Sequence, residues 1–346
     1  MKKVGFGIIG AGMIARFHAQ SMASLENVKL IGFFDTSLSA AVKCAEEFNC
    51  KAFSTFEEFL ADSEIEAVTI ATPSGFHHLS VIPAAKAKKH ILCEKPLEIT
   101  TEKCDELIAC CRQNKVYLIP VFQTRFYPAI QKVQQAAKQG RFGKMLFASV
   151  RMHWYREQSY YDSSSWRGTW AVDGGGALMN QAIHHIDQLL WIAGDATSVS
   201  ALSATRTHQI EVEDNLAALV QFKSGATGTI EVSTSCKPGF PRRLEFTGDC
   251  GSAVIEEDNI VRWVFDQTYP EDEAILSDLR AKNENAAGGS DPRNIKADGH
   301  ALQIADLAKA IRSGHAPMLD AEEGRRTVEF ICGVYNSVRT GKSHIF

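Results

Sequence analysis

The sequence predicts an N-terminal α/β domain with a doubly wound parallel sheet, followed by an α+β domain with a large, mostly antiparallel open sheet. In the first third of the chain, short apolar runs alternate with amphipathic stretches, and several runs are apolar on both faces, as in strands covered by helices on both sides. After residue 125 the runs become β-rich and turn-length gaps separate them, which favours antiparallel pairing. The 346 residues suffice for two domains with separate cores.

The expected elements follow in order along the chain. Strands of the first domain are expected at Val4–Ile9, Val28–Phe34, Ala67–Ala71, His90–Cys93 and Val116–Phe122. Strands of the second are expected at Lys144–His153, Ser198–Thr205, Leu216–Phe222, Ala226–Ser235, Arg243–Thr247 and Ser252–Glu256. A polar excursion from Asp266 to Asp298 and closing helices at Ala301–Arg312 and Ala321–Arg339 complete the prediction, with domains at 1–124 and 125–346.

Composition narrows the class of partner. The chain is 45% hydrophobic and 23% charged with a net charge of -4, and it has no long Lys/Arg block, so we expect a small-molecule partner and no nucleic acid. Nine cysteines without a C-x-x-C pair indicate reduced thiols. The start, Met1-Lys2-Lys3 before an apolar run, imitates a secretory signal, but glycines interrupt the run. We therefore expect a cytoplasmic protein with no membrane contact.

The first apolar run leads directly into a glycine-containing turn, Gly10-Ala11-Gly12-Met13-Ile14-Ala15. A G-x-G-x-x-A string between a strand and a helix is typical of dinucleotide-binding Rossmann domains. Gly10 allows the tight turn, Gly12 lets backbone N–H groups approach a pyrophosphate, and Ala15 lets the helix pack closely on the strand. A turn without a ligand is the alternative.

Asp35 follows the second apolar run, where a carboxylate can bind the adenosine ribose hydroxyls of a dinucleotide. A negative charge there repels a 2'-phosphate, so NAD is favoured over NADP. The alternative is a helix N-cap, and both roles can coexist.

Two polar segments follow the next strands, at the carboxyl ends where ligands bind in open α/β sheets. Residues 71–78 read Ala-Thr-Pro-Ser-Gly-Phe-His-His, and residues 93–96 read Cys-Glu-Lys-Pro. Lys95 could orient a substrate hydroxyl and stabilise it as a hydride leaves. By position alone, a surface lysine is the simpler interpretation.

Together these motifs resemble the Gfo/Idh/MocA family of sugar dehydrogenases, which combines the glycine turn, an A-T-P segment ending in His, and a Glu-Lys-Pro motif. The resemblance continues in the second half, where Gly174–Leu178 leads to His184-His185-Ile186-Asp187. It covers essentially the whole chain.

The resemblance places the family's essential lysine on Lys95 and its proton-accepting histidine on His184 rather than His185. Asn180 stands four residues before His184, where polyol-oxidising members often have Asp, and on a helix the two would share a face. A core histidine is the alternative for His184. We expect Lys95, His184 and Asn180 to be catalytic.

The segment around Trp166-Arg167 and Met179–Ala182 looks like the branch that oxidises the 3-hydroxyl of UDP-N-acetylglucosaminuronic acid. The resemblance implies that Trp166 and Arg167 reach the cofactor, although packing of the tryptophans is an alternative. It places Gln123 near the nicotinamide and Arg125 near a substrate anion, with an interdomain ion pair as the alternative for Arg125.

The complete expectation adds His300 as a residue that could reach the substrate, and no metal site. Substrate contacts are then expected from Lys95, Arg125, Asn180, His184 and His300. Cofactor contacts are expected from Gly10, Gly12, Met13, Ile14, Asp35, Thr72, Pro73, Ser74, His77, Glu94, Lys95, Gln123, Trp166 and Arg167.

The expected reaction is oxidation of a sugar hydroxyl by NAD, with the proton passing to His184 and Lys95 stabilising the developing alkoxide. Three alternatives remain: another sugar or inositol dehydrogenase, a redox-neutral glycosidase or isomerase that recycles NAD, and a non-catalytic NAD(H)-binding regulator. An open sheet needs its outer face covered, so we expect a homodimer or homotetramer through that face.

Overall fold

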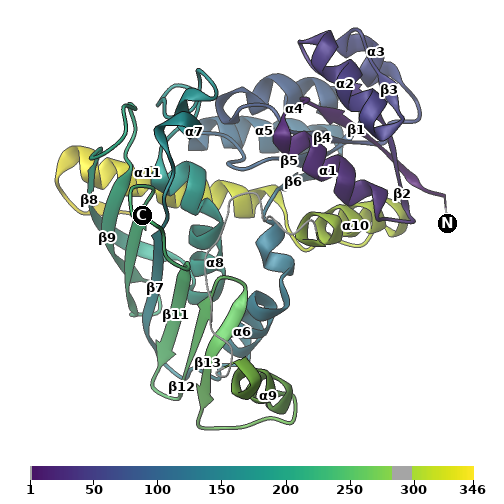
Figure 1. The fold of residues 1–346 in the computed structure, drawn as a ribbon. Helices are drawn as coiled ribbons and strands as arrows, with labels where there is room; N and C mark the ends of the chain where they lie inside the picture. Colours follow the sequence, from purple (N-terminus) through teal and green to yellow (C-terminus); the bar gives the residue numbers. More distant parts are fainter. Residues whose placement is uncertain (1, 283–297) are drawn as a thin grey trace. The chain divides into compact units, whose positions relative to one another are not determined.

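The computed structural model describes residues 2–282 and 298–346, and the chain divides into two compact units (Figure 1). The first unit comprises Met1–Gln123, Ala171–Gly174 and the described part of Lys296–Val328. The second comprises Thr124–Trp170, the described part of Gly175–Ile295, and Glu329–Phe346. From the sequence we expect cofactor binding in residues 1–124 and substrate binding in residues 125–346, and this division of roles stays a prediction.

The first unit contains a six-stranded parallel sheet with the order β3-β2-β1-β4-β5-β6, which confirms the predicted Rossmann topology. The central strands are almost entirely buried and apolar, as a sheet between helices requires. The strands are β1 (Val4–Ile9), β2 (Val28–Phe34), β3 (Lys51–Ala52), β4 (Ala67–Ile70), β5 (His90–Cys93) and β6 (Leu118–Pro120).

Local signals begin the helices of this unit. Thr55 and Thr100 each accept a hydrogen bond from a backbone N–H of the first turn that follows them. The helices are α1 (Met13–Ala23), α2 (Leu38–Phe48), α3 (Phe56–Ala61), η1 (Ser74–Phe76), α4 (His77–Lys86), α5 (Thr101–Asn114) and α10 (Asp298–Ser313), with η2 (Gln123–Phe126) and α11 (Ala321–Thr340) continuing into the second unit. Helix α10 packs against α1.

The second unit contains an eight-stranded sheet with the order β13-β12-β11-β7-β10-β9-β8-β14. Among the described strands of this sheet, only the pairing of β7 with β10 is parallel, so the predicted mostly antiparallel sheet is confirmed. The strands are β7 (Met145–His153), β8 (Ala196–Ala204), β9 (Asn215–Phe222), β10 (Thr227–Ser233), β11 (Arg243–Gly248), β12 (Gly251–Glu256), β13 (Asn259–Phe265) and β14 (His344–Ile345).

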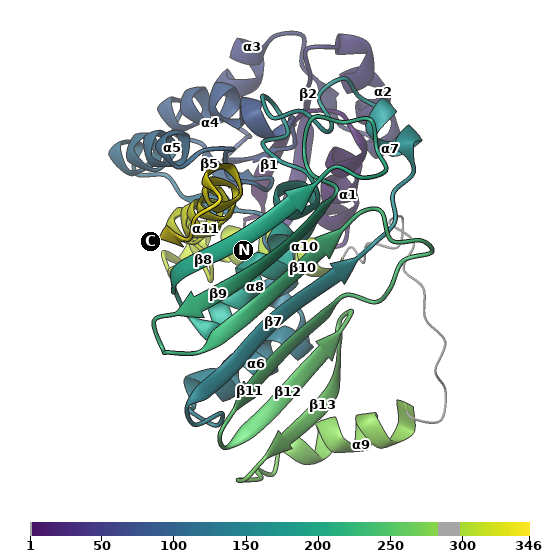
Figure 2. The same cartoon turned by 90° about the vertical axis from the view of Figure 1, so that its left-hand side faces the viewer.

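One face of this sheet is packed and the other is open (Figure 2). Helix α8 (Ile183–Ala193) packs on β7 and β11, and α6 (Pro128–Lys138) lies on the same side. On the opposite face, Phe147 and Leu219 are 61% and 66% exposed. The remaining helices are α7 (Gln158–Asp162), η3 (Ala177–Ala182) and α9 (Asp272–Lys282). Helix α9 occupies part of the predicted polar excursion, and residues 283–297 lie outside the described residues.

Candidate functional site

The glycine turn after β1 has the geometry that a pyrophosphate requires. Gly10 has φ +103°, and a Cβ there would lie 2.7 Å from the carbonyl oxygen of Ala71. Gly12 begins α1 without a side-chain cap, and no heavy atom outside its chain neighbours lies within 4 Å of where its Cβ would be. This space lies beside the positive end of the α1 dipole, where phosphates bind. Met13 is exposed, Ile14 is half-buried and Ala15 is buried against the sheet.

Asp35 stands directly after β2 and joins this turn. Its Oδ2 accepts a hydrogen bond from the Ala11 N–H at 2.8 Å, and its Oδ1 accepts one from the Ser37 N–H at 2.8 Å. The side chain is half-buried. The carboxylate therefore lies beside the phosphate-binding turn and also orders the start of α2, so the binding and capping roles considered for it are compatible.

Buried polar atoms without partners mark two of the expected cofactor contacts. Within the described part of the chain, Thr72 Oγ1 and Gln123 Oε1 are buried and have no hydrogen-bond partner. Such atoms cost free energy unless a ligand or water satisfies them. Together with the open start of α1, they fit a dinucleotide whose amide and hydroxyl groups would bind them. Pro73 and Ser74 directly follow Thr72 in the sequence, where Pro73 precedes η1 and Ser74 is its first residue.

His77 connects the two loops that follow β4 and β5. Its Nδ1 lies 2.9 Å from the Pro96 carbonyl oxygen and its Nε2 lies 3.1 Å from the Thr72 carbonyl oxygen. Burial lowers the pKa of His77, although the hydrogen bonds to the Thr72 and Leu97 carbonyl oxygens act in the opposite direction. This geometry indicates a structural bridge that holds the loop of Lys95 in place, and the expected cofactor contact of His77 stays a prediction.

Glu94 belongs to a buried cluster that the sequence did not reveal. Its Oε1 lies 2.6 Å from His18 Nε2, and its Oε2 accepts a hydrogen bond from the Lys95 N–H at 3.2 Å. Burial opposes ionisation, but the His18 hydrogen bond and the charges of His18, His300 and Lys95 lower the pKa of Glu94 to about 2. The ionised carboxylate therefore fixes the backbone at Lys95.

His300 lies in α10 and is buried, with its ring 5.1 Å from that of His18. Burial lowers the pKa of His300 to about 4. The ligand atoms of His18, Glu94 and His300 lie within 4.8 Å of one another, so among the described residues these three could hold a metal ion. The short His18–Glu94 hydrogen bond favours a hydrogen-bonded cluster, and the expected substrate contact of His300 stays a prediction.

In the second unit, the expected base and its neighbour lie on one helical segment. Asn180 belongs to η3, a π-helix, and His184 lies in the first turn of α8, which continues it. Both side chains are half-buried, whereas His185 is buried and burial lowers its pKa well below the usual range. A π-helical turn often occurs at functional sites. His184 is therefore the accessible histidine of the pair, as expected for a base.

Arg125 is buried and forms a bidentate ion pair with Asp187 of α8. The distances are 2.7 Å from Nε to Oδ2 and 2.6 Å from Nη2 to Oδ1, and the guanidinium stacks on Trp191. An anion would have to compete with this buried pair, at a large desolvation cost. The geometry thus favours an ion pair, within the second unit, and the expected substrate contact of Arg125 stays a prediction.

Asn180 is connected to the predicted Trp166-Arg167 pair through Tyr160. The Tyr160 hydroxyl accepts hydrogen bonds from Arg167 Nη1 at 2.6 Å and from Gln181 Nε2 at 2.8 Å, and Gln181 also donates to Asn180 Oδ1 at 2.6 Å. The Arg167 guanidinium lies over the rings of Tyr160 and Trp166. Arg167 therefore supports the Asn180 segment, a role that the sequence alone did not suggest.

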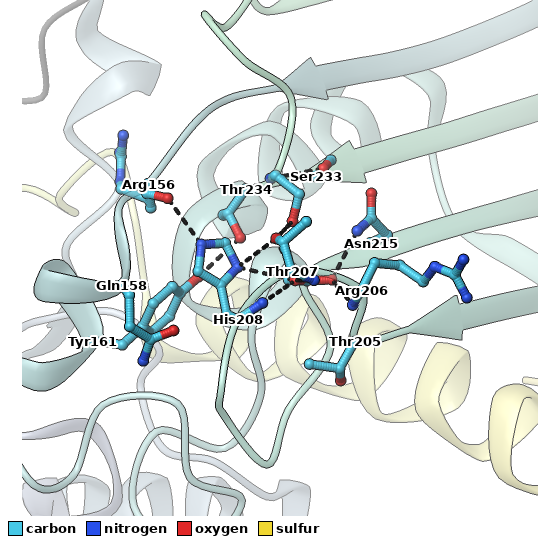
Figure 3. A network of polar contacts seen from close by, with 12 residues as sticks. Arg156, Gln158, Tyr161, Thr205, Arg206, Thr207, His208, Asn215, Ser233 and Thr234 are labelled. Carbon is cyan, nitrogen blue, oxygen red and sulfur yellow. Dashed lines mark hydrogen bonds and ion pairs between the residues drawn. The ribbon is translucent and has the colours of Figure 1, made fainter.

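A second network includes Arg156, whose side chain donates to Gln181 Oε1 at 2.9 Å. His208 lies in the loop between β8 and β9, and its Nε2 lies 2.8 Å from the Arg156 carbonyl oxygen (Figure 3). Its Nδ1 lies 2.9 Å from Oδ2 of Asp214, which belongs to the same loop. Although burial opposes it, hydrogen bonds from the N–H groups of Thr207 and Arg206 hold the pKa of Asp214 well below its usual range. The loop therefore supports the polar cluster around Asn180.

Comparison with known proteins matches both halves of the chain. The model of the oxidoreductase family with an NAD-binding Rossmann fold matches residues 4–122, and the model of the GFO/IDH/MocA C-terminal domain matches residues 130–254. No described helix is long and apolar enough to span a membrane.

Two similar solved structures are WlbA dehydrogenases in complex with NADH and UDP-GlcNAcA. The one from Bordetella pertussis is 30% identical with a TM-score of 0.88, covering 100% of this chain and 99% of that one. The one from Chromobacterium violaceum is 29% identical with a TM-score of 0.90, covering 100% and 96%. Myo-inositol 2-dehydrogenase of Thermotoga maritima is 25% identical over 92% of this chain and 91% of its own.

Proposed function

Since the chain belongs to the Gfo/Idh/MocA family of NAD(P)-binding oxidoreductases, we propose that it is an NAD-dependent dehydrogenase that oxidises a secondary hydroxyl of a sugar or nucleotide sugar. The best single candidate is the 3-hydroxyl of UDP-N-acetylglucosaminuronic acid. The observation that carries this choice is the whole-chain similarity, at 29–30% identity, to two dehydrogenases that bind NADH and UDP-GlcNAcA.

NAD is proposed in preference to NADP because of Asp35. Its carboxylate lies beside the glycine turn, held by the Ala11 N–H, and a 2'-phosphate there would meet a like charge. The open N-terminus of α1 would bind the pyrophosphate, and Thr72 and Gln123 would bind polar groups of the cofactor.

The proposed roles of the protein's own residues are a base and a charge stabiliser. His184 accepts the proton of the substrate hydroxyl, and Lys95 stabilises the oxygen as negative charge develops on it. Glu94, ionised and bonded to the Lys95 N–H, fixes the lysine backbone. When bound, the nicotinamide supplies the acceptor for the hydride.

The experiment is to release and identify the cofactor of the purified protein, and then to add UDP-N-acetylglucosaminuronic acid and free sugars while NADH absorbance is followed. Reduction by the nucleotide sugar supports the full proposal. Bound NAD without reduction by any sugar, polyol or nucleotide sugar would contradict the dehydrogenase activity and leave the cofactor assignment in place.

A further inference from the structure

The helical segment that carries Asn180 and His184 begins with four backbone N–H groups. Two residues from other parts of the chain accept hydrogen bonds from them. The first N–H groups of a helix have no partner within the helix. Here Glu213, which precedes β9, supplies three acceptors, and Tyr335 of α11 supplies the fourth. The bonds run from Gly176 to Glu213 Oε2 (3.0 Å), from Ala177 to the Glu213 carbonyl oxygen (2.9 Å), from Leu178 to Glu213 Oε1 (2.9 Å) and from Met179 to the Tyr335 hydroxyl (3.2 Å).

The two acceptors are joined to each other. The Tyr335 hydroxyl donates to Glu213 Oε1 at 2.9 Å while it accepts from the Met179 N–H, so its single proton and a lone pair are both used. Glu213 is buried, and its two carboxyl oxygens together accept three hydrogen bonds, from the Gly176 N–H, the Leu178 N–H and the Tyr335 hydroxyl. The arrangement therefore fixes the start of η3 at four successive amides.

The glycine run explains how these groups come so close. A Cβ at Gly175 would lie 2.1 Å from the Tyr335 hydroxyl, and a Cβ at Gly176 would lie 1.9 Å from the Glu213 carbonyl oxygen. Any other residue at either position would push the acceptors away. The glycines before the expected base are thus required by the contact with Glu213 and Tyr335.

Burying a carboxylate at the start of a helix costs desolvation free energy. Burial raises the pKa of Glu213 to about 7, although the N–H groups of Leu178 and Gly176 and the Tyr335 hydroxyl act in the opposite direction. A serine or threonine cap would serve stability at lower cost. What a carboxylate adds is several short, directional bonds to consecutive amides.

We propose that Glu213 and Tyr335 are positioning residues that hold the Asn180–His184 segment in the register needed for proton transfer. This inference rests on the proposed function, because it takes His184 as the base. Neither residue need contact the substrate. A misplacement of the base by about 1 Å can cost about 100-fold in rate, so the expected effect is on turnover rather than on cofactor binding.

The test compares Glu213→Gln with Tyr335→Phe and a control, Glu211→Gln. We call Glu213 and Tyr335 the clamp. Glutamine at position 213 keeps one acceptor oxygen, but its NH₂ group then faces a backbone N–H that needs an acceptor. Phenylalanine keeps the aromatic packing on Trp170 and removes only the hydroxyl. Glu211 is an exposed carboxylate of the same segment that binds Trp170 instead of the helix start.

Two measurements are needed, because Glu213→Gln could also destabilise the fold. In folded protein, amide hydrogen exchange over residues 176–184 should accelerate by about tenfold or more in Glu213→Gln, less in Tyr335→Phe, and not in Glu211→Gln. Turnover should fall about 10-fold to 100-fold in Glu213→Gln while KM and the Kd for NAD change by less than about threefold.

Unchanged exchange in both clamp variants would overturn the inference, whatever the activity. Faster exchange with wild-type turnover would overturn it too, because the segment would then not need to be fixed. If Glu213→Gln does not fold, Tyr335→Phe decides both points. If the wild-type protein turned over none of the substrates, the proposed function would be wrong. Amide hydrogen exchange would still show whether Glu213 and Tyr335 fix residues 176–184.

Discussion

The carboxylate of Asp35 accepts a hydrogen bond from the Ala11 N–H at 2.8 Å, which ties the end of β2 to the turn that begins α1. These residues are 24 positions apart, yet the parallel pairing of β1 with β2 brings their strand ends together. The contact places a negative charge next to the turn where phosphates bind. Cofactor choice should therefore depend on that charge.

Asp35→Asn should shift preference toward NADP. The amide keeps an acceptor for the Ala11 N–H and removes the charge that opposes a 2'-phosphate, so the ratio of kcat/KM for NAD to that for NADP should fall about tenfold, equivalent to ~1.4 kcal/mol. Steady-state kinetics with both cofactors measures it. Glu57→Gln, which removes an exposed charge of the same unit, should leave the ratio unchanged. An unaltered ratio in Asp35→Asn would show that the carboxylate does not face the ribose.

Lys95→Ala should lower turnover about 100-fold or more and spare NAD binding, because the role we propose for the lysine is to stabilise charge that develops only during reaction. Initial rates and calorimetric titration with NAD separate the two effects. Lys86→Ala, an exposed lysine at the end of α4, serves as the control. Near-wild-type turnover on a confirmed substrate would make this assignment wrong.

Strands with a continuous apolar pattern could be predicted with accuracy. The bounds of β1 and β2 agree with the expected runs, because β1 is buried throughout and most of the apolar residues of β2 are buried. Strand β13 was missed, because exposed residues interrupt its apolar ones, and β3 and β14 are too short, at two residues each, to make a pattern. Local periodicity therefore predicts the core and leaves out the edges.

Residues that act through distant partners could not be found this way. His18 lies on α1 among alanines, and its partner Glu94 is 76 positions away. Glu213 contacts Gly176 across 37 positions and Tyr335 across 122, and in the sequence it looks like an ordinary charge before a strand. Motifs predicted Lys95 and His184, whereas the residues that support them became visible only through tertiary contacts.

Asn180→Asp should move the acid limb of the pH profile of kcat/KM to higher pH. A carboxylate four residues before His184, close to Tyr160 and Gln181, would favour the imidazolium and raise the pKa of the base by about 1 unit. Profiles of the wild-type protein, Asn180→Asp and Asn180→Ala should be compared. Asn180→Ala should lower activity without moving the acid limb of the profile. An acid limb that does not move in Asn180→Asp would mean that residue 180 does not lie near the base.

The open face of the second sheet should join copies of this chain in a homodimer or homotetramer. Leu219 faces outward from β9 and is 66% exposed, beside Thr229 of β10 in the register of the sheet. Leu219→Glu should lower the mass measured by light scattering, because a carboxylate would be buried in the interface. Leu79→Glu, at a 59% exposed leucine of α4, should not. A monomeric wild-type protein would contradict the prediction.

Glu213 should also make the stability of the protein depend on pH in a direction opposite to that of most carboxylates. Its pKa is raised from 4.5 to about 7 in the folded state, so between these two pH values the native protein retains a proton that the unfolded chain has lost. This contribution to the free energy of unfolding is fully present below pH 4.5 and disappears as pH rises through about 7. The slope is at most about 1.4 kcal/mol per pH unit.

Glu213→Gln has no proton to lose at this position, so its contribution is constant. Denaturant unfolding of both proteins between about pH 5 and about pH 8 should therefore show the wild type losing stability relative to the variant as pH rises. Glu211→Gln should follow the wild type. A difference between wild type and Glu213→Gln that stays constant over this range would mean that Glu213 titrates outside it, and that the carboxylate is held charged throughout.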